Sequence, residues 1–122
     1  VEGRPNPVGG YTPERVALRR AMVLAHDRDS EIYVLRKGQA IAAQTPIPPG
    51  VVGYDPAFRS NAQDYDPARA KALLDMVGYV DRDGDGWREQ PDGKPLVIDY
   101  KYLAGGQDGR ELGELAPALL EL

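Results

Sequence analysis

Cysteine is absent from this 122-residue sequence, and histidine, tryptophan and phenylalanine each occur once. Without cysteine, disulfides and thiolate metal sites are excluded, whereas reducing and oxidising compartments both remain possible. The single histidine, His26, lies in no motif that pairs a nucleophile with a base. An enzyme centred on His26 is therefore the least favoured hypothesis, and we expect no catalytic residues and no cofactor.

Long apolar runs and an excess of positive charge are missing as well. No apolar stretch approaches the roughly 18 to 20 residues that span a bilayer. Fifteen basic and nineteen acidic residues are interspersed and leave a net charge of −4. This balance predicts no nucleic-acid partner, because such partners require a basic patch or stripe.

The length suits one compact domain. Residues 1–10 are rich in glycine and proline and predict an irregular lead-in, so the folded part is expected over residues 11–122. The sequence begins at Val1 rather than at a methionine and stops within an apparently helical run. We therefore expect a segment of a longer protein.

Three helices are predicted from caps and apolar spacing. The pairs Thr12-Pro13 and Asp66-Pro67 each match a cap followed by proline at the first helical position, and predict helices over 13–26 and from 67 to about 77. Between these, Asp27 can cap a shorter helix that ends at Gly38, with Ile32 and Leu35 pointing inward. Prolines at positions 46, 48, 49 and 56 predict an extended coil from 39 to 60.

Residues 87–90 and 96–103 flank the turn signature Pro91-Asp-Gly-Lys94 and predict a β-hairpin with one long strand. The expected fold class is α/β, with helices packed on a small sheet. An exposed edge of that sheet predicts dimerisation of the chain. Asp108 and Glu111 predict the start of a last helix, which Pro117 would interrupt.

The stretch DRDGDGWREQPD, residues 81–92, opens like a calcium-binding EF-hand loop. Asp81, Asp83 and Asp85 occupy loop positions 1, 3 and 5, whereas position 12 is Asp92 instead of glutamate. Pro91 and the proline that follows Lys94 also forbid the helix that should come next. Aspartate and glycine equally favour plain tight turns, so a structural turn is preferred, and a calcium-binding module using these four aspartates is the alternative.

Five motifs occur in an order that is typical of one family. They are Ala25-His-Asp-Arg28, Gly38-Gln-Ala40, Pro46-Ile-Pro-Pro49, the stretch Tyr65 to Leu74, and the acidic turn at residues 81–86. With these motifs the chain, over roughly residues 13–112, resembles the extracellular solute-binding proteins of ABC transporters, of the dipeptide- and oligopeptide-binding type.

The resemblance implies part of the second lobe of a periplasmic-binding-protein-like fold, located in the periplasm or outside the cell. It implies capture of peptides or similar small solutes without chemistry, delivery to an ABC transporter permease, and a ligand held between two lobes. The loop after the predicted strand is then expected to border that cleft. Its residues are Leu103, Ala104, Gly105, Gly106, Gln107 and Asp108.

Overall fold

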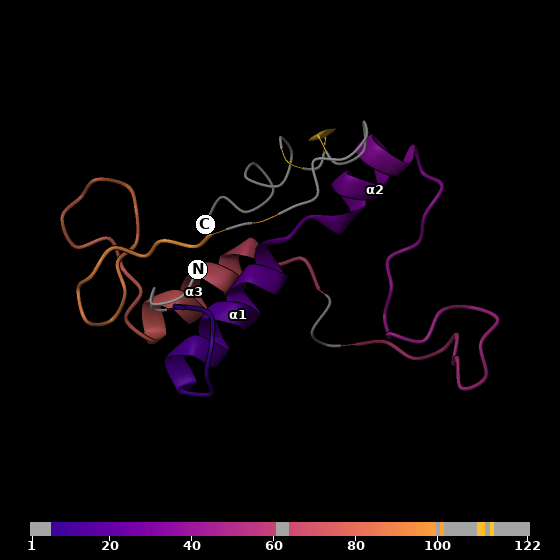
Figure 1. Cartoon of the computed structure of the whole chain (residues 1–122), viewed down its shortest axis with the longest axis horizontal. Helices are drawn as coiled ribbons and strands as arrows, with labels where there is room; N and C mark the ends of the chain where they lie inside the picture. Colours follow the sequence, from indigo (N-terminus) through magenta and orange to yellow (C-terminus); the bar gives the residue numbers. More distant parts are fainter. Residues whose placement is uncertain (1–5, 61–63, 100, 102–109, 112, 114–122) are drawn as a thin grey trace.

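The computed structural model describes residues 6–60, 64–99, 101, 110, 111 and 113. The helices in this part of the chain are α1 (Pro13–Ala25), α2 (Arg28–Arg36) and α3 (Pro67–Met76). α1 and α3 lie side by side and form the centre of the molecule, while α2 lies beyond the end of α1 (Figure 1). The three helices predicted from caps and spacing are confirmed.

α1 begins as its proline predicts. Thr12 has the extended backbone of a cap residue, and Pro13 occupies the first turn, where its missing N–H would have had no helical partner. One face of the helix is buried, and Leu18 and Leu24 are its largest buried side chains. Ala17, Ala21 and Ala25 complete that face, so the apolar spacing of the sequence corresponds to a real contact surface.

α2 is capped but hardly buried. The Asp27 carboxylate accepts the Ser30 backbone N–H at 3.0 Å and the Ser30 hydroxyl at 2.7 Å. These bonds to Ser30 hold the pKa of Asp27 below its ordinary value. The helix ends at Lys37 and Gly38, both with positive φ. Ile32 and Leu35 lie on its less exposed side, as expected, but they are only half-buried, and no α2 residue is fully buried.

α3 is joined to α1 by Asp66, the cap residue that precedes it. The Asp66 backbone N–H donates to the Leu24 carbonyl at 2.8 Å, and the Asp66 carboxylate accepts the Arg69 N–H at 2.9 Å. Ala70 and Leu74 then face α1, and Tyr79 closes the same core from beyond the helix end. Burial raises the pKa of the Tyr79 phenol. The described part of the chain thus has one small core, built between α1 and α3.

The predicted β-hairpin is wrong. Glu89 and Pro95 form an isolated antiparallel bridge, and the Gln90 N–H donates to the Lys94 carbonyl at 2.8 Å, so only the turn exists. Residues 96–99 are not in a strand. Pro95 has no N–H to donate at the point where a ladder would begin, and a lone two-stranded hairpin is marginal in any case. Leu96 packs against the α1–α3 core instead.

The α/β expectation with a small sheet is therefore corrected, because the described residues contain helices and no strand. Dimerisation through a strand edge loses its basis for the same reason. Most of the predicted last helix lies outside the described residues, although 110, 111 and 113 are helical. Among the residues that could be searched, no helix is both long enough and apolar enough to cross a membrane.

Residues 39–60, called the proline arm below, leave α2 and loop away from the α1–α3 core before returning to α3 (Figure 1). The arm has no helix or strand, so the extended coil predicted from its prolines is confirmed.

Candidate functional site

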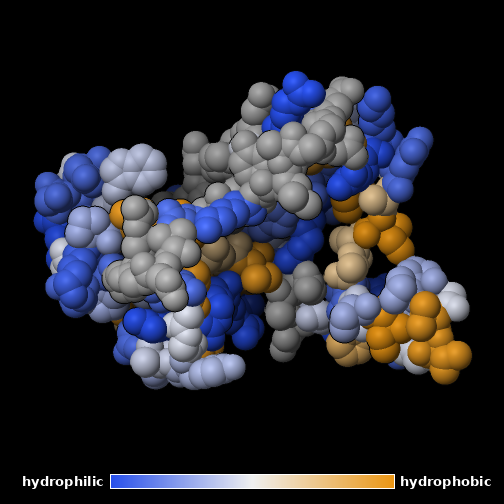
Figure 2. All heavy atoms as spheres, in the orientation of Figure 1, coloured by the Kyte–Doolittle hydropathy of each residue, from blue (hydrophilic) through white to orange (hydrophobic). Residues whose placement is uncertain are grey.

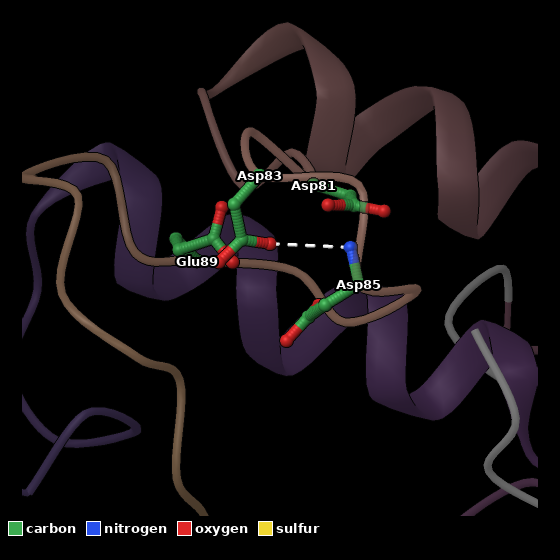
Figure 3. Close-up of side chains that lie close together, drawn as sticks. All are labelled: Asp81, Asp83, Asp85 and Glu89. Carbon is green, nitrogen blue, oxygen red and sulfur yellow. Dashed lines mark hydrogen bonds between the residues drawn. The ribbon is translucent and has the colours of Figure 1, made fainter.

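The acidic turn gathers four carboxylates on one exposed loop that follows α3. Asp81, Asp83, Asp85 and Glu89 each offer an oxygen, and these oxygens lie within 4.8 Å of one another (Figure 3). Oxygen atoms at such spacing are the ligand type that hard cations prefer. The arrangement must therefore be weighed against what the same oxygens already bind.

These carboxylates accept hydrogen bonds from backbone N–H groups. Asp81 accepts the N–H groups of Gly84 at 2.7 Å and Gly86 at 2.9 Å, one on each oxygen. Asp85 accepts the Trp87 N–H at 2.8 Å. Gly84 and Gly86 both have positive φ, which glycine adopts without strain, so these bonds close a tight turn.

Two further bonds complete the turn. The Asp83 carboxylate accepts the Asp85 N–H at 3.2 Å (Figure 3), and the Glu89 carboxylate accepts the Arg82 N–H at 2.7 Å. All four acidic side chains thus satisfy backbone donors of their own loop. These bonds give the carboxylates the structural role preferred from the sequence, and the calcium-binding alternative is not supported.

The fourth ligand expected from the sequence is in the wrong place. Asp92 accepts the Lys94 ammonium at 2.7 Å and the Lys94 N–H at 3.2 Å, and the pKa of Asp92 lies below its usual range mainly because of the bond to the Lys94 side chain. Glu89 joins Asp81 and its neighbours instead. Glu89 occupies position 9 of the same EF-hand spacing, which is also a ligand position, so that spacing could have found it.

Arginines attach the acidic turn to the core. Arg82 donates to the carbonyls of Gly78 and Gln90, both at 3.0 Å. Arg88 donates to the Asp75 carboxylate and, at 2.6 Å, to the Tyr79 carbonyl. The turn is therefore fixed to the end of α3 by side chains that reach past its own loop.

Replacing Asp81 by alanine is expected to lower the free energy of unfolding by about 1 kcal/mol, because two backbone N–H groups lose their acceptor. Asp83→Ala is the matched control, since it removes only one bond of 3.2 Å and should cost less than about 0.5 kcal/mol. Urea denaturation followed by circular dichroism measures both. Equal losses, or a melting temperature of the unaltered protein that rises with added calcium, would contradict the structural role.

His26 joins two helices. Its Nε2 lies 2.8 Å from a Glu31 carboxylate oxygen, and the two side chains are 29% and 25% exposed. His26 is the residue after α1, and Glu31 lies in the first turn of α2, so the pair sets the corner between the helices. This arrangement gives His26 a packing role at the corner.

The residues expected to line a ligand cleft, 103–108, lie outside the described residues. Their assignment stays a prediction. The Ser30 hydroxyl donates to the Asp27 carboxylate at 2.7 Å, and the Thr45 hydroxyl oxygen accepts the Ile47 N–H at 3.3 Å, so both serve local structure.

Comparisons with known proteins give a consistent result. The family model "Bacterial extracellular solute-binding proteins, family 5 Middle" matches residues 11–120. The di/tripeptide-binding protein 2 of Pseudomonas aeruginosa is 39% identical over 63 residues, and the dipeptide-binding protein of Escherichia coli is 37% identical over 65 residues. Each alignment covers 52% of this chain, and the chain spans 12% and 11% of these two relatives.

Solved structures agree. A crystal structure of a periplasmic oligopeptide-binding protein of an oligopeptide ABC transporter from Thermotoga maritima matches with a TM-score of 0.64 at 27% identity, over 94% of this chain and 23% of that one. A second structure of that protein, with mannohexaose bound, matches with a TM-score of 0.65 at 28% identity, over 95% and 23% of the two chains.

Proposed function

Because this chain belongs to the family 5 bacterial extracellular solute-binding proteins, we propose that it forms part of a longer protein that captures peptides for an ABC importer. The observation that carries the proposal is the family match over residues 11–120, together with relatives that are named for binding dipeptides and tripeptides. The intact protein would act in the periplasm or at the cell surface and would hand its ligand to a membrane permease.

Binding would be noncovalent. Family membership supports this proposal, and so does the commitment of His26 to Glu31 at the α1–α2 corner. Closure of two lobes around the ligand would exclude water and create the form that a permease recognises. The loop at 103–108, placed after an apolar stretch and before a helical one, is our proposed contribution of this chain to the cleft.

Oligosaccharides are the second candidate ligand class. In one structure from Thermotoga maritima, a protein that is named as an oligopeptide-binding protein has mannohexaose bound. A backbone of this shape is therefore compatible with a sugar as well as with a peptide in a related protein. Peptides remain the first proposal because the two curated relatives are both peptide-binding by name.

Isothermal titration calorimetry of the longer protein that contains this chain tests the proposal. Dipeptides, tripeptides and mannohexaose are titrated separately, and at least one peptide class is expected to bind. The 122-residue chain alone should release no measurable heat, because it would supply only part of the contacts. Binding of mannohexaose but of no peptide would favour the second candidate ligand class. The absence of binding heat with every ligand would contradict both proposals.

Substitutions in the loop at 103–108 test whether its residues contact the ligand. In the longer protein, Gln107→Ala and Asp108→Ala are expected to weaken ligand binding at least about tenfold, the equivalent of one lost polar contact of about 1.4 kcal/mol. Asp83→Ala is the matched control, because it alters an exposed carboxylate of the acidic turn and should leave affinity unchanged. Unchanged affinity in both cleft variants would remove this loop from the site.

A further inference from the structure

The proline arm has no core of its own. Its exposed large apolar side chains are Phe58 at 49%, Val51 at 51%, Ile41 at 72% and Val52 at 100%, whereas Ile47 and Tyr54 are half-buried. The neighbouring α2 also exposes two large apolar side chains, Tyr33 and Val34. Figure 2 shows hydrophobic residues gathered at the end of the arm, away from the α1–α3 core. Contiguous exposed apolar surface of this kind marks an interaction site.

Local bonds nevertheless hold the arm in shape. The Ser60 N–H donates to the Gln44 side-chain oxygen at 3.0 Å and so joins the two ends of the arm across sixteen positions. Turns close at its tip, where the N–H groups of Val51 and Tyr54 donate to carbonyls three residues earlier at 3.3 and 3.0 Å. Prolines restrict the backbone between these bonds. A surface ordered in advance loses less entropy when a partner covers it.

The arm also borders an open hollow of about 660 Å³. Ile41, Ile47, Tyr54 and Phe58 are among the residues that line it. The one cation of this lining, Arg59, donates to the carbonyls of its own segment at 2.8 and 2.9 Å.

Two further polar side chains that line the hollow also form hydrogen bonds within the arm. The Asp55 carboxylate accepts the Ala57 N–H at 2.8 Å, and the Gln44 oxygen is bound to Ser60. Several polar atoms therefore already have partners within the arm, and the larger part of the surface that lines the hollow is apolar. Apolar side chains of a polypeptide fit such a hollow, whereas a charged solute would gain little there.

We propose that the proline arm and α2 form the surface through which this chain packs against the rest of the same solute-binding polypeptide. This inference rests on the proposed function, because it needs a longer protein. The Thermotoga maritima structure matches 94% of this chain, so most of the arm falls within the matched backbone. That match spans only 23% of the solved chain, which leaves most of that polypeptide available to cover such an arm.

Charge argues against a membrane as the occupant. Residues 39–60 carry one acidic and one basic side chain, Asp55 and Arg59. Attraction to anionic lipid requires a cluster of lysines or arginines, which this segment does not have. An apolar protein surface is the chemistry that matches a nearly neutral, apolar arm.

Thiol labelling tests the inference, since the 122 residues contain no cysteine. Val52→Cys is introduced into this chain and into the longer protein, with any cysteines outside these residues replaced by serine. A maleimide reagent is expected to modify the variant rapidly in this chain and at least about fiftyfold more slowly in the longer protein. Val52 is fully exposed here, so the substitution should not disturb folding, which helical circular dichroism verifies.

Lys71→Cys on the exposed side of α3 is the matched control and should react at the same rate in both proteins. Equal rates for Val52→Cys, or equal protection of both variants, would overturn the inference. Protection that appears in this chain alone and rises with its concentration would assign the surface to a second copy and would also overturn it. Calorimetry on the same longer protein distinguishes this inference from the proposed function. If Val52→Cys is protected but no ligand binds, only the proposed function is refuted.

Discussion

Replacing Leu74 by alanine is expected to lower the free energy of unfolding by about 2 to 5 kcal/mol. Leu74 is 1% exposed and is one of the three largest fully buried side chains of the described core. The substitution leaves a cavity between α1 and α3, the helix pair on which that core is built. Because total stabilities are about 5 to 15 kcal/mol, a loss of this size should remove a large share of the total.

Met76→Ala is the control for this prediction. Met76 lies at the end of the same helix and is 76% exposed, so its truncation should change the unfolding free energy by less than about 0.5 kcal/mol. Urea denaturation of both variants, followed by circular dichroism, gives the comparison. If the Leu74 and Met76 variants lost similar stability, the α1–α3 core would not be the main source of folding energy.

Replacing Arg88 by methionine is expected to cost about 1 to 3 kcal/mol. The Arg88 side chain is 18% exposed and donates to the Asp75 carboxylate and the Tyr79 carbonyl. Methionine retains much of the apolar stem but leaves the Tyr79 carbonyl without this donor. The acidic turn should then separate from α3, and faster amide hydrogen exchange over residues 81–90 reports that separation.

Lys94→Met provides the matched comparison. Lys94 also pairs with an aspartate, Asp92, at 2.7 Å, but the two side chains are 74% and 53% exposed. Exposed pairs contribute about 0 to 1 kcal/mol, so this variant should stay close to the unaltered protein. A Lys94 variant that is less stable than the Arg88 variant would contradict the proposed attachment of the turn.

Local signals in the sequence were sufficient for the helices. α1 and α3 each start at a cap residue followed at once by proline, as at Asp66 and Pro67, and α2 and α3 end beside residues with positive φ. These preferences act within one turn of backbone, so neighbouring residues decide them. The proline arm was predictable for the same reason, because proline restricts its own and the preceding residue.

The hairpin was not predictable in this way. Alternating residues after Pro95 favour a strand, but a strand forms only where another segment supplies hydrogen bonds, and the described residues provide a single bridge. The acidic turn shows the same limit on a smaller scale. Asp81 and Gly86 indicated a tight turn and Glu89 lies at position 9 of the EF-hand spacing, whereas the absence of Asp92 from the carboxylate cluster depends on where the chain folds back.

Exposure of the proline arm could not be read from composition either. Its valines and isoleucines predict burial on any hydropathy scale, yet Val52 is fully exposed. The sequence contains no information about which surface would cover them if that surface belongs to another part of a longer polypeptide.

Native mass spectrometry of the longer protein, purified without added ligand, tests the central claim most directly. The claim is that this chain is part of a noncovalent solute-binding protein. We predict a species heavier than the polypeptide by the mass of one peptide or oligosaccharide, which is released intact when the protein is denatured. A protein that carries no such ligand and acquires none from a mixture of peptides and oligosaccharides, or that converts the ligand to products, would contradict the claim.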